Sequence, residues 1–233
     1  TVTGSDNVAI TLGGTAISGS PYSSAVGAGA ISRSQSLVTT SSSTVVSDSS
    51  VTLTLHAKDA FGNTITTGGE IVVFTASGGG STGNLGSTND AGNGTYSASF
   101  TGVLAGSATT IHATIGGSAV TSALPTVTVT ANHATHLVFV VEPSTAAINT
   151  AISPAIQVAA VDNDGNVDLA YSGSGFSMAL TIHAGTGDNT ATLTGGGSIN
   201  AVNGVATFAA VSIDKAHTGY ELDAIALAPA PGL

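Results

Sequence analysis

Short segments in which apolar and polar side chains alternate recur along the whole chain, and this pattern limits its fold more than any other feature. Residues 51–55, 96–100 and 205–208 alternate in this way, as half-buried β-strands do. The continuous apolar runs 71–74 and 137–141 suit strands in the centre of a two-sheet core. Since no helical stripe interrupts these segments, we expect an all-β chain.

Pairs of residues that favour turns separate the alternating segments. They lie at Asp6-Asn7, Gly13-Gly14, Gly62-Asn63, Gly68-Gly69, Asn93-Gly94, Gly116-Gly117, Gly165-Asn166 and Asn203-Gly204. Gly and Asn tolerate the positive φ that tight hairpins require. Short strands joined by such frequent turns predict β-sandwiches.

The sequence repeats itself with a period of about one hundred residues. Residues 55–63 align with residues 158–166, and in both copies an apolar strand ends in the pattern D-x-x-G-N. Further along each copy, an Asn-Gly pair opens another strand. We therefore expect two homologous units, residues 31–131 and 132–233, each close to the roughly 100 residues of an immunoglobulin-type sandwich.

The two ends of the chain depart from this repeat. Residues 1–30 are too few for a third sandwich and predict one hairpin, which aligns with residues 110–129 and looks like the last two strands of a preceding or neighbouring unit. The last unit reaches residues 228–233 where its closing strand is expected, so we expect it to lack that strand. An open apolar edge is a template for pairing with another chain.

Three stretches of the first unit are residues 57–69, 92–102 and 105–111. They resemble bacterial immunoglobulin-like (Ig-like) domains of the invasin type and filamin-type Ig repeats. Residues 94–96 resemble a tyrosine corner, in which a Tyr hydroxyl bonds a backbone group where the sheets cross, and the last unit has Ala206 in place of this Tyr. The resemblance implies tandem Ig-like β-sandwiches in a large secreted or surface protein, and it is more specific for fold than for function.

The charge composition excludes several classes of partner. Three Lys and Arg residues stand against 13 Asp and Glu residues, which gives a formal net charge of -10. Binding to nucleic acid or to anionic lipid needs clustered basic residues, and no apolar run approaches the ~20 residues of a membrane span. We therefore expect neither a nucleic-acid partner nor membrane insertion.

One candidate metal site stands out in the last unit. Asp162, Asp164, Asn166 and Asp168 form the pattern D-x-D-G-x-x-D, whose oxygen atoms could surround Ca²⁺ with a Gly at the tight turn. The alternative is a plain strand-to-strand turn, because residues 59–65 make the same turn without the second and third carboxylates. Apart from this calcium hypothesis, we expect no cofactor.

These features favour a non-catalytic function. The chain has no Cys and few cations, and a Ser-His-Asp set can be written from any chain so rich in Ser. We predict a structural and adhesive repeat of an extracellular bacterial stalk or filament, whose partners are neighbouring Ig-like repeats or copies of the chain joined head to tail by strand addition. The alternatives are a module that binds a glycan or a host or cell-surface receptor, and an accessory domain of a secreted enzyme.

Overall fold

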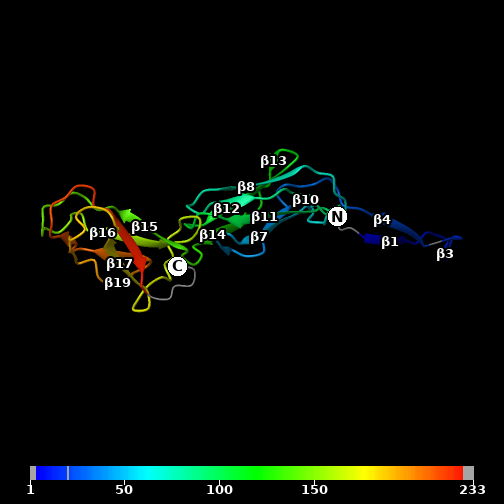
Figure 1. Ribbon diagram of the computed structural model, residues 1–233. Coiled ribbons are helices and arrows are strands. Elements are labelled where there is room, and N and C mark those ends of the chain that lie inside the picture. The colour runs from blue at the N-terminus through cyan, green and yellow to red at the C-terminus, as the bar shows by residue number, and fades with distance from the viewer. Residues whose placement is uncertain (1–3, 20, 228–233) are drawn as a thin grey trace. The chain divides into compact units, whose positions relative to one another are not determined.

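The computed structural model describes residues 4–19 and 21–227, and every regular element in them is a β-strand (Figure 1). Contacts divide the chain into two compact units, Thr1–Val129 and Thr130–Leu233, which we call unit 1 and unit 2. The predicted all-β fold with tandem Ig-like sandwiches is confirmed. The finer domain limits drawn from the repeat stay predictions.

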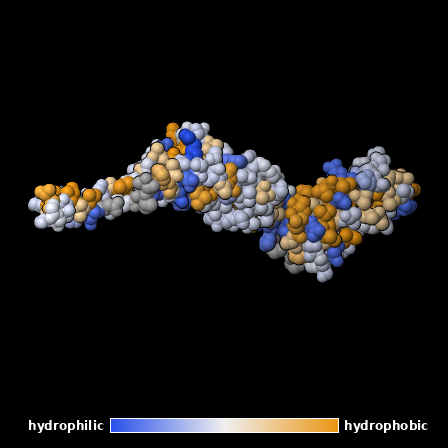
Figure 2. All heavy atoms as spheres, turned by 180° about the vertical axis from the view of Figure 1, so that it is seen from behind, coloured by the Kyte–Doolittle hydropathy of each residue, from blue (hydrophilic) through white to orange (hydrophobic). Residues whose placement is uncertain are grey.

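A hairpin comes first, and the described side chains of its strands are exposed. β1 (Gly4–Val8) pairs antiparallel with β4 (Tyr22–Val26), and β2 (Thr11–Leu12) pairs with β3 (Thr15–Ala16) around a Gly-Gly turn. The two turn glycines have φ of 60° and 82°, which suits a type I′ turn. Apolar surface is visible along this hairpin in Figure 2. The N-terminal hairpin that the sequence predicts is therefore present.

Unit 1 contains two antiparallel sheets that share one core. The first has the strand order β10-β11-β7-β5, with β9 also paired to β11. Its strands are β5 (Leu37–Thr40), β7 (Ser50–His56), β9 (Gly83–Leu85), β10 (Asn89–Asp90) and β11 (Thr95–Gly102). The second has the order β13-β12-β14-β6, with β8 also paired to β12. Its strands are β6 (Thr44–Val46), β8 (Val72–Ser77), β12 (Thr109–Ile115), β13 (Ser118–Ala119) and β14 (Thr126–Thr130).

Alternation along these strands builds the core of unit 1. β7, β11 and β12 bury every second side chain, because successive residues of a strand point to opposite faces of its sheet. Leu53, Leu55, Phe100 and Ile111 are fully buried in one cluster. Burying a side chain of this size stabilises a fold by roughly 1.5–3 kcal/mol. The apolar residues of the alternating pattern therefore lie on the core face of each strand, and the polar residues lie on the solvent face.

The two continuous apolar runs are edge strands, so their prediction as central strands is wrong. In the described part of the chain, β8 pairs only with β12, and β15 (His136–Val141) pairs only with β16. Val72 and Phe74 are buried, whereas Ile71 and Val73 are exposed. A continuous apolar run looks the same in a central strand and in an edge strand whose outer face is apolar. The sequence pattern therefore cannot distinguish the two positions.

Unit 2 contains a second core. Its sheets have the orders β15-β16-β20 and β19-β17-β22, and β18 pairs with β21. The strands not yet placed are β16 (Ile156–Val161), β17 (Ser177–Ile182), β18 (Leu193–Thr194), β19 (Ile199–Asn200), β20 (Val205–Phe208), β21 (Ser212–Ile213) and β22 (Leu222–Ala226). Ile156, Val158, Met178 and Phe208 are buried together in this core.

The Asn-Gly pairs give the two copies the same local geometry. Gly94 and Gly204 have φ of 79° and 83°. A Cβ on Gly94 would lie 2.2 Å from the carbonyl oxygen of Ile65, and a Cβ on Gly204 would lie 2.6 Å from that of Asp168. Ile65 and Asp168 each lie six residues after the first Asp of the D-x-x-G-N pattern. The same contact at aligned positions supports the internal repeat.

The two units differ at one sheet edge. In unit 1, β14 lies between β12 and β6. β22 is the counterpart of β12, because it pairs with β17 as β12 pairs with β8. Within residues 130–227, no strand pairs with the other side of β22. Residues 228–233, where the sequence analysis expects the closing strand to be missing, lie outside the described residues.

Candidate functional site

Each sandwich contains a D-x-x-G-N turn, which we call an Asp turn. In unit 1, the buried Asp59 uses Oδ1 to accept the backbone N–H groups of Phe61 and Asn63, both at 2.9 Å. Its Oδ2 accepts the side-chain amide of Asn63 at 2.8 Å and the backbone N–H of Gly29 at 2.9 Å. The bonds from the Asn63 side chain and from Gly29 are the main reasons why the pKa of Asp59 is far below its ordinary value.

The Asp turn of unit 2 is built in the same way. The buried Asp162 uses Oδ1 to accept the backbone N–H groups of Asp164 at 3.0 Å and Asn166 at 2.9 Å. Its Oδ2 accepts the side-chain amide of Asn166 at 3.0 Å and the backbone N–H of Asn132 at 2.9 Å. Four donors therefore hold equivalent positions around the carboxylates of both turns.

The distant donor in each turn belongs to the segment that enters the sandwich. Gly29 follows the N-terminal hairpin and Asn132 follows β14, and each lies 30 residues before the Asp that it contacts. A hydrogen bond to an ionised carboxylate is stronger than one between neutral groups. The Asp turns therefore hold the segment around Gly29 against unit 1 and the segment around Asn132 against unit 2. We call each of these the entering segment of its unit.

The four residues of the calcium hypothesis make these structural hydrogen bonds. Asp162 and Asn166 form the Asp turn, and half-buried Asp164 lies within it. Asp168 accepts the backbone N–H of Ala134 at 3.0 Å through Oδ2 and that of Ala170 at 2.9 Å through Oδ1. The described residues contain no group of three or more His, Asp or Glu placed to hold a metal. These contacts support the plain turn over the calcium hypothesis, which a calcium titration can test.

The buried tyrosine comes from different positions of the repeat in the two units. In unit 1 the buried Tyr96 accepts the backbone N–H of Glu70 at 3.2 Å through its hydroxyl, as a tyrosine corner bonds a backbone group. In unit 2 the core contains the buried Ala206 and also Tyr171, whose ring packs 4.9 Å from that of Phe176. Burial raises the pKa of Tyr171, whose hydroxyl has no hydrogen-bond partner among the described residues. The alternating strand pattern gave no signal for Tyr171, since it lies in a loop.

Residues 79–83 fit the G-x-S-x-G pattern of serine hydrolases, but Ser81 has a structural role. Its buried hydroxyl donates to the carbonyl of Gly106 at 2.9 Å and accepts the backbone N–H of Val129 at 2.9 Å. A hydrolase nucleophile instead projects from a strand-to-helix turn, and the described residues contain no helix. Ser81 therefore holds β14 in the sandwich.

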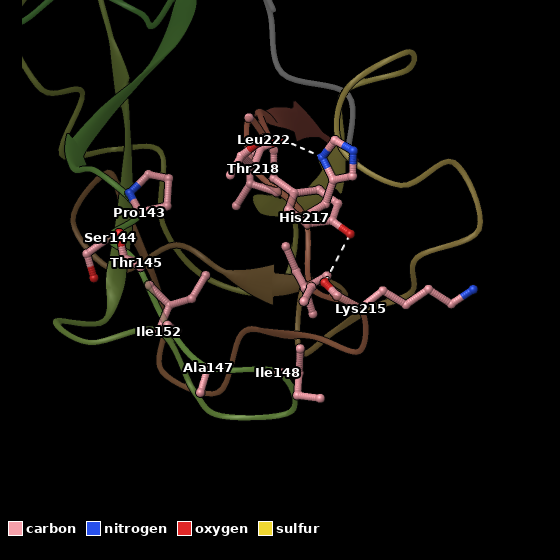
Figure 3. Close-up of a pocket in the computed structure, with 15 residues that line it drawn as sticks. Pro143, Ser144, Thr145, Ala147, Ile148, Ile152, Lys215, His217, Thr218 and Leu222 are labelled. Carbon is pink, nitrogen blue, oxygen red and sulfur yellow. Dashed lines mark hydrogen bonds between the residues drawn. The ribbon is translucent and has the colours of Figure 1, made fainter.

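A groove of about 580 Å³ opens on unit 2 (Figure 3). One wall is residues 143–148 with Ile152, and the other consists of Ile213, residues 215–220 and Leu222. Figure 3 shows Pro143 and Ser144 on the opposite side of the opening from His217. No Asp or Glu is among the described residues that line it. No local sequence pattern predicts this groove, because its walls come from segments far apart in the chain.

A polar cluster stabilises one wall of the groove. The Lys215 ammonium donates to the Thr190 hydroxyl, which donates to Asp188 at 2.6 Å. The bonds from Thr190 lower the pKa of Asp188 from its ordinary value. The Tyr220 hydroxyl donates to the Lys215 carbonyl at 3.1 Å, and its ring meets the edge of His217 at a centroid distance of 6.0 Å. The wall is therefore an ordered part of unit 2.

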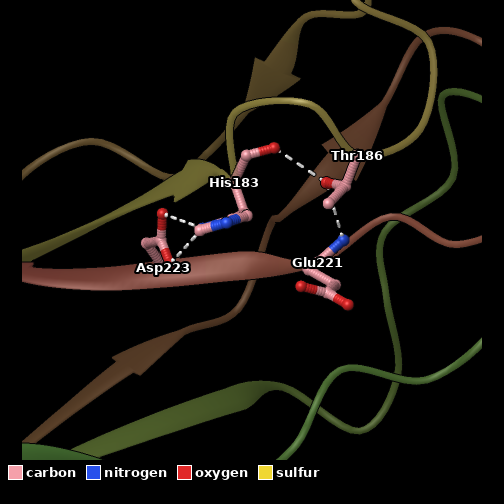
Figure 4. A network of polar contacts seen from close by, with 4 residues as sticks. All are labelled: His183, Thr186, Glu221 and Asp223. Atoms are coloured by element: carbon pink, nitrogen blue, oxygen red, sulfur yellow. Dashed lines mark hydrogen bonds and ion pairs between the residues drawn. The ribbon is translucent and has the colours of Figure 1, made fainter.

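His183 and Asp223 form a pair on the surface of unit 2 (Figure 4). His183 Nδ1 lies 2.9 Å from Asp223 Oδ2, and both side chains are about half exposed. The Thr186 hydroxyl links the two strand ends, because it donates to the His183 carbonyl and accepts the backbone N–H of Glu221. Exposed pairs of this kind contribute at most about 1 kcal/mol, and neither partner lines the groove.

These features define a class before any relative is considered: a chain of Ig-like β-sandwiches whose polar side chains serve the fold. Residues 32–132 match the family model of invasin domain 3, which confirms the resemblance seen in the sequence. This segment therefore resembles an invasin-type bacterial Ig-like repeat. No curated protein matches the chain. The described residues contain no helix that is long and apolar enough to cross a membrane.

Solved structures of bacterial adhesins are similar to the chain. The Escherichia coli adhesin FdeC is 20% identical with a TM-score of 0.49, and the match covers 99% of this chain and 70% of that one. The Yersinia pseudotuberculosis adhesin InvE is 19% identical with a TM-score of 0.45, over 84% and 56%. Invasin, described as a bacterial integrin-binding protein, is 18% identical with a TM-score of 0.47, over 88% and 42%. The chain thus covers less than two thirds of InvE and of invasin.

Proposed function

We propose that the chain is a non-catalytic structural and adhesive repeat segment of an extracellular bacterial surface stalk or filament. The observation that carries this proposal is the repeated Asp turn, which fastens the entering segment at Gly29 in one unit and at Asn132 in the next. Sandwiches joined in series give reach away from a surface. The invasin-type match of residues 32–132 supports a place on the bacterial surface.

The chemistry of the described side chains supports a non-catalytic role. General acid-base catalysis needs a titratable group that can reach a substrate. Asp59 and Asp162 are buried and accept four or more hydrogen bonds each from the protein. The groove of unit 2 has no carboxylate in its described lining. The carboxylates of Asp59 and Asp162 therefore stabilise the fold.

Force spectroscopy on the full chain, held by its two ends, tests the structural role. We expect two separate unfolding events, one for each sandwich, because each has its own core. Each event should release about 3.3–3.6 Å of length per unfolded residue. One event for the whole chain, or extension without measurable resistance, would contradict the proposal.

Cell binding tests the adhesive role. Beads coated with the full chain should bind host epithelial cells more than beads coated with serum albumin. If the two kinds of bead bind equally, the adhesive part of the proposal is wrong, whereas the force measurement still decides the structural part.

A specific observation favours the second candidate, a glycan- or receptor-binding module. Phe61 lies in the Asp turn of unit 1 and is 69% exposed, and aromatic residues including Phe are enriched at protein interfaces relative to the rest of the surface. The equivalent residue in unit 2 is Asp164. If the chain binds a ligand on a glycan array, Phe61→Ala should abolish the signal, whereas Leu169→Ala, at another exposed apolar position, should leave it unchanged.

A further inference from the structure

The chain contains two Asn-Gly pairs, Asn93-Gly94 and Asn203-Gly204, which the repeat brings to equivalent places in the two sandwiches. Each pair comes directly before a strand, β11 in unit 1 and β20 in unit 2. Both Asn residues are exposed, and both glycines are buried and have positive φ. The two pairs thus share their sequence and their access to solvent, and they differ in their hydrogen bonds.

An Asn side chain can react with the backbone nitrogen of the residue that follows it. Glycine in that position has no Cβ to crowd the approach of backbone and side chain. The nitrogen must first give up its proton, and a hydrogen bond to an acceptor holds that proton in place. An exposed Asn before a Gly with a free N–H therefore favours spontaneous loss of the side-chain amide.

The hydrogen bonds of unit 2 protect its Asn-Gly pair. The Gly204 N–H donates to the carbonyl of Tyr171 at 3.0 Å. The Asn203 N–H donates to the hydroxyl of Ser172 at 3.1 Å. Tyr171 is buried in the core, so its carbonyl leaves the Gly204 N–H only when this part of the sandwich opens. The nitrogen that would attack Asn203 therefore keeps its proton in the folded chain.

The pair in unit 1 lacks this protection. Among the described residues, no acceptor receives the Gly94 N–H. The Asn93 Oδ1 accepts the Thr95 N–H at 3.1 Å, an Asx turn that holds the side-chain carbonyl beside the peptide bond between Asn93 and Gly94. This hydrogen bond also draws electron density away from the carbonyl carbon. Unit 1 therefore places a polarised, exposed amide next to a backbone nitrogen whose proton is free.

We propose that Asn93 is a site of spontaneous deamidation, and that the hydrogen bond to Tyr171 protects Asn203 from the same reaction. The Gly94 nitrogen loses its proton to solvent and forms a bond to Asn93 Cγ. The bond between Cγ and Nδ2 breaks, and the departing nitrogen takes a proton from solvent and leaves as ammonia. Water then opens the cyclic imide. Cleavage between the ring nitrogen and Cγ gives Asp, whereas cleavage between that nitrogen and the backbone carbon gives isoaspartate.

Isoaspartate lengthens the main chain at a place where unit 1 has little room. The Gly94 carbonyl accepts the Ala57 N–H at 2.8 Å, and a Cβ on Gly94 would lie 2.2 Å from the Ile65 carbonyl oxygen. An additional backbone atom before Gly94 shifts the start of β11 against both neighbours. Conversion of Asn93 therefore weakens unit 1 with age and leaves unit 2 intact. This chemistry does not depend on the proposed surface role.

Ageing of the full chain in mildly alkaline water enriched in heavy oxygen tests the proposal. Digestion with pepsin in acid and mass spectrometry then measure the heavy oxygen at each Asn, because only conversion during ageing incorporates it. A methyltransferase specific for isoaspartate identifies that product. We expect Asn93 to convert at least about fivefold faster than Asn203, the factor that one hydrogen bond of ordinary net strength gives. Equal rates, or a faster rate at Asn203, would overturn the proposal.

The same measurement in concentrated urea separates the effect of the fold from that of the local sequence. The two rates should become similar, because the unfolded chain keeps neither the bond from Gly204 to Tyr171 nor the Asx turn at Asn93. If Asn93 keeps its full lead in urea, the residue after the glycine sets the rates and the structural argument is wrong.

Two matched variants test the consequence for stability. Asn93→Ser keeps an oxygen that can accept the Thr95 N–H but has no amide to lose, and Asn203→Ser is its counterpart in unit 2. Relative to fresh protein, the aged parent chain and aged Asn203→Ser should contain a population whose unit 1 unfolds at lower denaturant concentration. Aged Asn93→Ser should contain none. If Asn93→Ser loses stability on ageing as the parent chain does, conversion of Asn93 is not what weakens unit 1.

Discussion

Unit 1 and unit 2 agree where the backbone is constrained and differ where side chains fill space. Both units bind the entering segment through an Asp turn, with Asp59 contacting Gly29 and Asp162 contacting Asn132 at the same distance. Both also bring a carbonyl oxygen against an Asn-Gly glycine. These hydrogen-bonded turns are therefore the part of the repeat that both units keep.

The cores of the two units have diverged. Tyr96 in unit 1 has a backbone partner for its hydroxyl, whereas unit 2 has Ala206 at that position of the repeat and a buried Tyr171 from a loop. β14 closes unit 1, and among the described residues of unit 2 no strand pairs with the other side of β22. Side chains from several positions of the repeat can fill the core. An Asp turn, in contrast, needs its donors and its acceptor at fixed positions.

The largest effect that we expect comes from the Asn-Gly contact. Gly94→Ala places a Cβ against the Ile65 carbonyl at positive φ, so it should destabilise unit 1 by about 3 kcal/mol or more. Gly92→Ala is the matched control, because it also has positive φ but open space around its Cβ, and should cost only about 1 kcal/mol. Chemical denaturation measures both, and equal losses would show that the contact with Ile65 is unimportant.

The Asp turns should control local opening of the entering segments. Asp59→Ala removes the acceptor of the Gly29 N–H, so hydrogen exchange at Gly29 should be about tenfold faster or more. Exchange at Asn132 should not change, because its acceptor is Asp162. Asp162→Ala should give the reverse pattern. A variant that speeds exchange at both sites would mean that the two turns are not independent.

Acid should weaken unit 1 through the same group. The pKa of Asp59 in the folded state is below the 3.8 of an ordinary Asp, so its contribution is fully present above about pH 4 and is lost as the pH falls further. The melting temperature of the parent chain should therefore drop below pH 4 more steeply than that of Asp59→Asn. Parallel pH profiles for the two chains would contradict this assignment.

The two core tyrosines should respond to the same substitution with opposite signs. Tyr171→Phe removes a buried hydroxyl that lacks a described partner and should stabilise the chain by about 1 kcal/mol. Tyr96→Phe leaves the Glu70 N–H without its acceptor and should destabilise the chain by about 1 kcal/mol. Thermal unfolding measures both, and a loss of stability in Tyr171→Phe would mean that its hydroxyl is satisfied.

Calcium should have the smallest effect. Asp162 and Asp168 direct their oxygens to N–H donors in the apo fold, so we expect no rise in melting temperature at millimolar Ca²⁺. A ligand that binds only the folded state must stabilise it. A clear rise that Asp164→Asn abolishes would favour the calcium hypothesis over the plain turn.

Much of the fold could be predicted from the sequence because its signals are local. The alternation in residues 51–55 and 96–100 specifies strands with one buried face, and β7 and β11 cover these residues. The D-x-x-G-N pattern predicts a turn because the Asp side chain can bond N–H groups two and four residues ahead. The apolar run 71–74 was misassigned, because whether a strand is central depends on neighbours that the run does not specify.

Patterns within short stretches of the sequence were enough to predict most strands and turns and the internal repeat, although the turn expected at Asp6-Asn7 lies within β1. Three features required the folded chain: the turn carboxylates bind Gly29 and Asn132, Tyr171 enters the second core, and residues 143–148 form a groove with residues 215–220. These contacts join residues about thirty or more positions apart. Their formation depends on how whole sheets pack, which no local pattern encodes.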